Sequence, residues 1–258
     1  MTRDGNIRIA VWNLTGPPSG VHFTQTVLKI NAFQRKFAPD IAFYLEAPEA
    51  RCEFLPGVES DKWAASFWTG AEEGTPRGIL CVKYQQPGHK DIRIEKFEVP
   101  DPRNPTALGI EVFYKEKAFL RVLGVWTLPD YMENLRGIVE KYRAFLTEKE
   151  ESGVLGVMAG DTNVILSPGY DKDDRNRQEI EASLPGKLRI VDGNVGGPTL
   201  LKEGKWFRCD LLVASDERNL AKAVLGQRPK DKVTGGDFSD HLPIIFEVPV
   251  LRVEAGEK

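Results

Sequence analysis

Short apolar runs, each bounded by Gly, Pro, Asp or Asn, recur along this sequence and restrict the folds that it can adopt. Runs of about four to eight residues that are rich in β-branched and aromatic side chains are typical of β-strands. The predicted strands cover Ile7 to Trp12, Asp40 to Leu45, Trp63 to Trp68, Gly78 to Tyr84, Ile92 to Val99, Leu108 to Tyr114, Ala118 to Thr127, Val154 to Ala159, Leu188 to Val191, Cys209 to Ala214 and Pro243 to Val250. A chain with so many strands must bury its sheets against each other or against helices.

Helical periodicity is confined to fewer segments. Apolar residues recur at steps of three and four from Phe23 to Phe37, and similar spacing predicts a helix within Pro129 to Lys149 and a weaker one from Asp174 to Leu184. A polar tip in the run Phe113 to Phe119 predicts a hairpin. Because the helices are inserted between strands without alternating strictly with them, we predict two packed sheets with helices on the outside.

The composition excludes several classes of protein. With 41% hydrophobic and 28% charged residues, the chain is not of the disordered type, and a single domain over residues 1–258 is expected. A formal net charge of -3 argues against a polycationic tail or a basic membrane-surface helix. Neither a secretory segment nor an apolar stretch near the ~18 residues of a membrane span is visible. We therefore expect a cytoplasmic protein without a membrane span, and no obligate protein partner is evident.

The cysteines predict neither a disulfide framework nor a zinc site. Cys52, Cys81 and Cys209 are widely spaced, and none forms a C-x-x-C pair. Cys81 and Cys209 lie in apolar runs, so we expect them to be buried free thiols.

Polar residues that could act in catalysis or bind a metal ion lie at the ends of separate predicted strands. They are Asn13, Glu46, Asp161 with Asn163, Asp210, and Asp240 with His241. Strict alternation along its strand would place Glu46 on the face of Ala42 and Tyr44. Each residue also has a plainer interpretation, namely an Asx-type turn after the strand, a salt bridge at the strand edge or a turn cap. If the strand ends converge, however, they form a pocket of oxygen ligands with one imidazole, which favours Mg²⁺ or Mn²⁺ over zinc.

In their order along the chain, these segments resemble the signatures of the endonuclease/exonuclease/phosphatase superfamily. The segments are the strand that ends in Asn13, Pro39 to Glu46, Gly160-Asp161-Thr162-Asn163, Cys209-Asp210-Leu211-Leu212 and Ser239-Asp240-His241-Leu242-Pro243. The resemblance spans Ile7 to Val248, and the two longer polar motifs are specific together rather than singly. It implies an α+β fold, a four-layer α/β/β/α sandwich with two packed mixed sheets.

The resemblance also implies a metal-dependent phosphoesterase and a role for each motif residue. Glu46 would be the main Mg²⁺ ligand, with Asp240 near the metal and Asn13 ordering metal and phosphate. Asp161 would orient and deprotonate the attacking water. The remaining roles concern the phosphate: Asn163 would bind an oxygen, and His241, held by Asp210, would contact the phosphoryl group.

One position departs from the family pattern. Trp126 stands at a strand end where the family has His or Tyr, and an indole cannot act as a general acid. The leaving-group acid role would then pass to water on the metal or to Tyr131. We expect Trp126 to line the site, and the plainer alternative is that it fills the core.

The substrate is less defined than the site. Basic groups in Lys205 to Arg208 and in Arg228 to Lys232 are candidates for phosphate contacts, with Arg208 and Lys230 as weak substrate-binding candidates, although solvated surface charge is the plainer interpretation of both clusters. The leading interpretation is a hydrolase acting on phosphodiester bonds, most simply a nuclease on DNA or RNA. The alternatives are a phosphatase or phosphodiesterase on a small-molecule or lipid-headgroup phosphoester, and a non-catalytic binding module that retains the fold.

Overall fold

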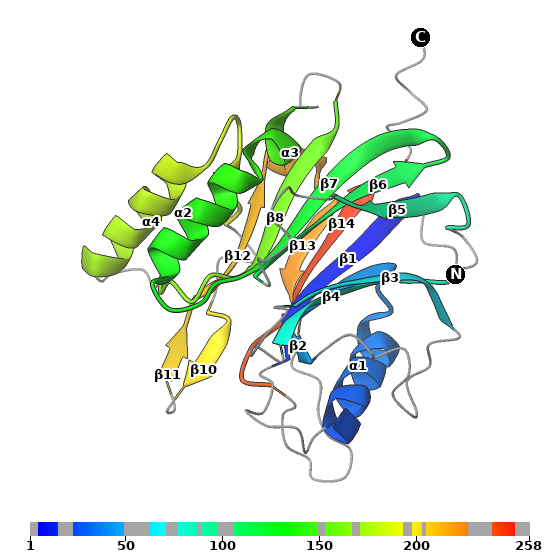
Figure 1. Cartoon of the computed structure of the whole chain (residues 1–258), viewed down its shortest axis with the longest axis horizontal. Coiled ribbons are helices and arrows are strands. Elements are labelled where there is room, and N and C mark those ends of the chain that lie inside the picture. The colour runs from blue at the N-terminus through cyan, green and yellow to red at the C-terminus, as the bar shows by residue number, and fades with distance from the viewer. Residues whose placement is uncertain are drawn as a thin grey trace.

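The computed structural model describes residues 5–14, 23–48, 62–70, 77–86, 89–97, 106–148, 153–166, 171–192, 198–202, 205–226 and 239–250. These residues form two six-stranded sheets and a two-stranded ribbon (Figure 1). The ribbon consists of β10 (Leu200–Lys202) and β11 (Lys205–Phe207).

The first sheet is mixed. Its strand order is β13 (Lys222–Leu225), β14 (Ile244–Pro249), β1 (Asn6–Asn13), β2 (Ile41–Pro48), β4 (Arg77–Tyr84) and β3 (Trp63–Gly70). Strands β1 and β2 run parallel, whereas the other neighbours are antiparallel. The carboxyl ends of β1 and β2 therefore lie at the same edge as the start of β14.

The second sheet is also mixed. Its strand order is β5 (Ile92–Lys96), β6 (Ala107–Tyr114), β7 (Lys117–Trp126), β8 (Leu155–Asp161), β12 (Asp210–Ala214) and β9 (Arg189–Ile190). Strands β7 and β8 run parallel, and the other neighbours are antiparallel. The predicted hairpin is confirmed, because β6 and β7 are joined by a tight turn in which Lys115 has a φ of 53°.

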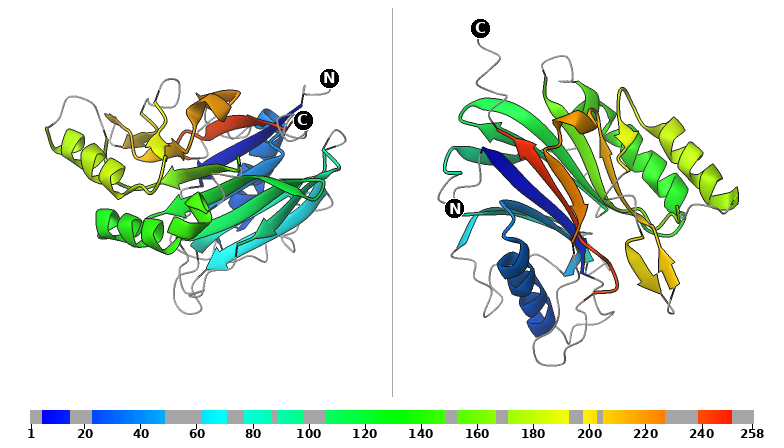
Figure 2. Two further views of the ribbon diagram at one scale, coloured as in Figure 1. Left: turned by 90° about the horizontal axis from the view of Figure 1, so that it is seen from above. Right: turned by 180° about the vertical axis from the view of Figure 1, so that it is seen from behind.

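The sheets pack face to face through alternate apolar residues, such as Val11 and Phe43 from the first sheet and Val122 and Leu212 from the second. Helix α1 (Phe23–Phe37) covers the outer face of the first sheet through Phe33. The outer face of the second sheet is covered by α2 (Tyr131–Lys141), α3 (Arg143–Thr147) and α4 (Asp171–Ser183). Figure 2 shows these layers from two further sides. The predicted four-layer sandwich is confirmed.

The predicted elements are present, with shifted ends. Helix α1 has the predicted bounds, and each predicted strand is found. The helix predicted within Pro129 to Lys149 is interrupted at Tyr142, which has a φ of -99° and separates α2 from α3. Strands β10, β11 and β13, together with the 3-10 helix η4 (Glu217–Asn219), were not predicted, because segments of three or four residues are too short for a clear periodicity.

Two further sequence predictions concern buried residues and membranes. Cys81 and Cys209 are buried free thiols, as predicted. Burial raises the pKa of each thiol well above the usual range of cysteine. Cys52 lies outside the described residues. No helix among the described residues is long and apolar enough to cross a membrane.

Candidate active site

The topology brings the predicted polar residues to one edge of the sandwich. Asn13 ends β1, and the antiparallel pairing of Val11 with Ile244 places the segment before β14, which carries His241, beside it. In the second sheet Asp161 and Asp210 are paired directly across β8 and β12. The two sheets meet here, because Asn13 Nδ2 donates a hydrogen bond of 2.8 Å to Asp161 Oδ2.

Glu46 joins this group through an irregularity in β2. The pairing of β2 with β4 shifts between Tyr44 and Ala47, and Glu46 has a positive φ of 54°. Ala47 consequently packs on the same side as Tyr44, against α1. The expectation from strict alternation, that Glu46 shares that face, is wrong, because a bulge changes the alternation of the side chains. Glu46 Oε1 accepts a hydrogen bond of 3.0 Å from Asn13 Nδ2.

Two basic residues that the sequence analysis missed lie beside Glu46. Arg77 Nη1 is 2.7 Å from Glu46 Oε2. Lys29 is buried, and its ammonium group donates a hydrogen bond to the Leu14 carbonyl. Burial lowers the pKa of Lys29 to about 8, against the opposing effects of Asp240 and Glu46. Lys29 lies one turn before Phe33 on the buried face of α1. A lysine on the apolar face of a predicted helix is unusual, and this feature of the sequence could have identified it.

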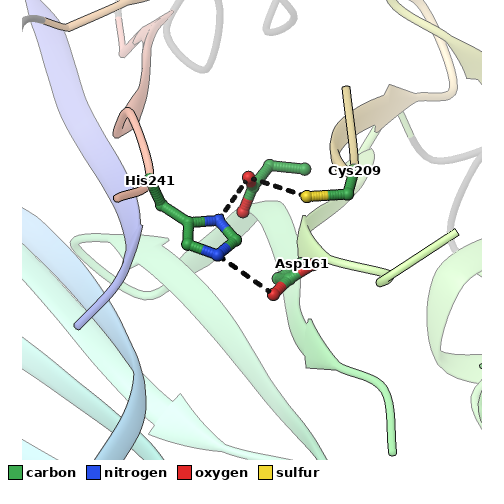
Figure 3. A group of neighbouring side chains, drawn as sticks. Asp161, Cys209 and His241 are labelled. Atoms are coloured by element: carbon green, nitrogen blue, oxygen red, sulfur yellow. Dashed lines mark hydrogen bonds and ion pairs between the residues drawn. The ribbon is translucent and has the colours of Figure 1, made fainter. Parts of the chain in front are cut away.

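His241 lies between two buried carboxylates (Figure 3). Its Nδ1 is 2.8 Å from Asp210 Oδ2, and its Nε2 is 3.7 Å from Asp161 Oδ2. Cys209 Sγ approaches the same oxygen of Asp210 at 3.7 Å. The four side chains form a compact buried group, with one potential ligand atom from each lying within 4.8 Å of the others.

The charges in this group perturb one another. Burial by itself lowers the pKa of His241, but the adjacent Asp210, followed by Asp161 and Asp240, raises it to about 10, so the ring is cationic at neutral pH. Burial and then the Asp210 carboxylate raise the pKa of Asp161, against the opposing charge of His241. Asp161 is therefore a carboxylate with enhanced proton affinity next to a cationic imidazole.

The loop that carries His241 is held in place by hydrogen bonds between side chains and the backbone. Ser239 Oγ donates a hydrogen bond of 2.7 Å to the Asn13 carbonyl and accepts one of 3.1 Å from the His241 amide. Trp12 Nε1 donates to the His241 carbonyl at 3.2 Å. The carboxylate of Asp240 is more exposed than its neighbours, and its Oδ1 lies 3.8 Å from His241 Nε2. This anchoring accounts for Ser239 in the motif.

Asn163 is fixed next to Asp161 in a left-handed conformation with a φ of 52°. Its backbone N–H donates a hydrogen bond of 2.8 Å to Asp161 Oδ1, and its side-chain Nδ2 donates one of 3.0 Å to the Thr127 carbonyl. This is an Asx-type turn, the plainer alternative for the motif, but the turn also holds the Asp161 carboxylate in place.

The other candidate residues differ in their surroundings. Trp126 is paired with Asp161 in the β7–β8 register, and its side chain belongs to the core between the sheets with 6% exposure. The preference for site lining over core filling is corrected accordingly, and any contact of Trp126 with substrate stays a prediction. Tyr131 is exposed at the start of α2.

The side chain of Arg208 is engaged in contacts within the protein, and substrate binding by Arg208 stays a prediction. Its side chain is buried, and its Nη1 lies 2.9 Å from Asp192 Oδ1, while its Nη2 donates to the Val191 carbonyl. The guanidinium thus stabilises the fold. Lys230 and the cluster Arg228 to Lys232 lie outside the described residues.

Gly160 is required by the packing of β8 against β7. It has a φ of 149°, and a Cβ at this position would lie 2.0 Å from the Val125 carbonyl oxygen. We predict that Gly160→Ala destabilises the protein by about 3 kcal/mol, because the β7 backbone would have to move. Urea unfolding monitored by circular dichroism measures this loss.

Gly137→Ala is the matched control. Gly137 lies in α2, and a Cβ there would meet no atom within 4 Å. Since alanine favours helices, this variant should be neutral or more stable by about 0.5 to 1 kcal/mol. Equal stabilities of the two variants would contradict the steric role of Gly160.

The donors at the site fit a hard divalent cation. Glu46 and Asp240 offer carboxylate oxygens, and both are more exposed than Asp161 and Asp210. Oxygen donors with access to solvent suit Mg²⁺ or Mn²⁺. Arg77 would compete with the cation for Glu46, because it already pairs with one oxygen of that carboxylate.

Comparisons with known proteins give matches at the level of structure. No family model and no curated protein matches the sequence. Similar solved structures include D. rerio TDP2 complexed with a single-strand DNA product, with 16% identity, 95% of this chain and 99% of that chain covered, and a TM-score of 0.63. An AP endonuclease from Archaeoglobus fulgidus has 14% identity, coverages of 93% and 98%, and a TM-score of 0.62. ANGEL2, described as a 2′,3′-cyclic phosphatase, has 14% identity, coverages of 95% and 95%, and a TM-score of 0.64.

All three similar structures belong to the endonuclease/exonuclease/phosphatase superfamily. The resemblance read from the motifs is thereby confirmed at the level of the fold. The shared fold covers nearly the whole chain.

Proposed function

We propose that this chain, which shares the fold of the endonuclease/exonuclease/phosphatase superfamily, hydrolyses phosphoester bonds with the help of a divalent cation, Mg²⁺ or Mn²⁺. The observation that carries the proposal is the hydrogen-bonded connection from Glu46 through Asn13 to Asp161, next to His241. This connection joins a candidate cation site to a candidate base and an imidazolium. These three elements together can catalyse phosphoester hydrolysis.

Glu46 and Asp240 would hold the cation, and Asn13 would keep Glu46 and Asp161 at a fixed separation. The cation, when bound, would neutralise charge on the phosphate and so allow an anion to approach this acidic edge. Arg77 would orient the Glu46 carboxylate through its 2.7 Å contact.

Asp161 would accept a proton from the attacking water. Its raised pKa favours that transfer, and two hydrogen bonds, from Asn13 and the Asn163 amide, hold its oxygens. As the water oxygen bonds to phosphorus, the bond to the leaving oxygen breaks. Asn163 would contact a phosphate oxygen, and Tyr131 or a water molecule would supply the proton of the leaving group.

His241, kept cationic by Asp210, would stabilise the negative charge that grows on the phosphoryl oxygens. The hydrogen bond of 2.8 Å between the two residues fixes the orientation of the ring. This role needs the proton to stay on the imidazole, which distinguishes His241 from Asp161.

For the substrate, we place phosphodiesters first and nucleic acids first among them. A similar structure, D. rerio TDP2, is complexed with a single-strand DNA product, which supports a nuclease. The alternative is a small phosphoester, and the similar ANGEL2 is described as a cyclic phosphatase. The ion pair of the buried Arg208 with Asp192 weakens the support that this basic group gives to a nucleic acid substrate. A cytoplasmic location stays a prediction.

The test is a panel of substrates assayed with and without divalent cations. It contains single- and double-stranded DNA, RNA, p-nitrophenyl phosphoesters, inositol phosphates and choline phosphoesters. We expect hydrolysis that EDTA abolishes and Mg²⁺ or Mn²⁺ restores, and a rise of about tenfold or more in the Mg²⁺ concentration for half-maximal activity in Glu46→Gln.

Each outcome of the panel selects one function. The highest kcat/KM on oligonucleotides supports the nuclease, whereas the highest value on an inositol or choline ester supports the small-molecule enzyme. Turnover that survives EDTA contradicts the metal-dependent proposal. If no substrate is turned over with either cation, the non-catalytic binding module is the hypothesis that remains.

A further inference from the structure

A groove of about 600 Å³ begins at the candidate active site and passes between α2, α4 and the segment that follows β8. The two helices lie side by side in Figure 1. Asn163 lines the groove at the site end, and its amide donates to the Asp161 carboxylate. A substrate whose phosphate contacts Asn163 can therefore extend directly into the groove. The volume of the groove is in the range of binding sites for small molecules.

Exposed apolar side chains gather in this groove. Among the described residues, three large hydrophobic side chains are exposed, namely Leu28, Tyr131 and Ile165. Tyr131 and Ile165 both line the groove, at 41% and 38% exposure, whereas Leu28 lies on α1. The Ile165 carbonyl accepts a hydrogen bond of 3.1 Å from Asn176 Nδ2, which ties this wall to α4. An aromatic and a branched apolar side chain from two different elements offer a flat ring an apolar surface.

The charges of the groove are predominantly negative. Among the described residues that line it, Asp130, Glu133 and Glu179 accompany a single cation, Arg136. Arg136 Nη2 is already 2.9 Å from Glu179 Oε2. The excess of carboxylates disfavours a second phosphate of the substrate in this position and leaves an uncharged group as the complementary occupant.

We propose that this groove binds an uncharged planar ring that the substrate carries next to the scissile phosphate. The inference rests on the proposed function, because the ring is placed relative to a phosphate at Asn163. It adds a specificity site made by Tyr131 and Ile165. A nucleobase and a simple aryl group share the required chemistry.

The experiment measures binding, so that it does not depend on turnover. Isothermal titration calorimetry with Mg²⁺ present compares phenylphosphonate with methylphosphonate, and thymidine 5′-monophosphate with ribose 5-phosphate. Wild type should bind the ring-bearing member of at least one pair about tenfold more tightly, since stacking on an aromatic side chain is of that order. Tyr131→Ser and Ile165→Ser should each reduce this preference at least threefold, and Leu28→Ser, the matched exposed apolar control, should retain it.

The outcomes separate this inference from the proposed function. A ring preference that disappears in both groove variants supports the ring site, and the pair with the larger preference identifies the kind of ring. No preference in wild type, or a preference unchanged in Tyr131→Ser and Ile165→Ser, overturns it. If the ring preference maps to the groove while no ester is hydrolysed, the ring site stands and the proposed catalysis fails.

Discussion

Asp161→Asn should lower kcat/KM for phosphoester hydrolysis by about 10³-fold, because the amide cannot take the proton of the attacking water. The protein should remain folded. Burial and the adjacent Asp210 already disfavour the ionised form of Asp161, as its raised pKa indicates, so a neutral side chain of the same shape is tolerated. Steady-state kinetics on the best substrate and a thermal melt without divalent cation measure the two effects.

Asp216→Asn is the control for this variant. Asp216 caps η4 by accepting a hydrogen bond from the Arg218 amide and is not among the residues of the candidate site. Its replacement should leave kcat/KM within a factor of about two, since surface substitutions have small effects. If Asp161→Asn stays folded and keeps full activity, Asp161 is not the base.

His241→Gln and Asp210→Asn should each reduce kcat by about 10²-fold, and the double variant should be no worse than either single one. The reason is that the two residues act as one unit. Asp210 keeps the imidazole charged through a 2.8 Å contact, and loss of this carboxylate lowers the pKa of His241, because burial is then opposed only by Asp161 and Asp240.

A second measurement separates this electrostatic role from a merely structural one. In wild type the ring signal of His241 in NMR should stay that of the protonated form through neutral pH. In Asp210→Asn the ring should lose its proton at a lower pH than in wild type. Additive losses in the double variant, or an unchanged titration of His241, would contradict the coupling.

Much of the architecture could be predicted from local pattern. The spacing of Val27, Ile30 and Phe33 predicted α1 with its observed bounds, because an amphipathic helix depends on residues a few positions apart. The alternation and turn residues of Ile7 to Trp12 predicted β1 in the same way. The polar residues at the strand ends were recognised as a group through their order along the chain, although their roles stay predictions.

Contacts between distant segments could not be predicted in this way. The side on which Glu46 lies depends on a bulge in the pairing of β2 with β4, and the partner at its Oε2 is Arg77, 31 residues away. Arg208 was a substrate candidate because it lies in a basic cluster, and its ion pair with Asp192, 16 residues away, was not visible in that stretch. Such contacts depend on strand register and on the packing of the layers, which no short stretch of sequence determines.

The sequence by itself determined the strand-rich composition, α1 and the polar residues that end the strands, since these follow from local periodicity and turn chemistry. Only the tertiary structure decided which of those residues meet. Pairing places Asp161 opposite Asp210, and sheet packing places Asn13 against Asp161. The groove between α2 and α4 likewise exists only in the folded chain. The physical reason is that a buried carboxylate obtains its pKa and its partners from the residues packed around it, wherever they lie in the sequence.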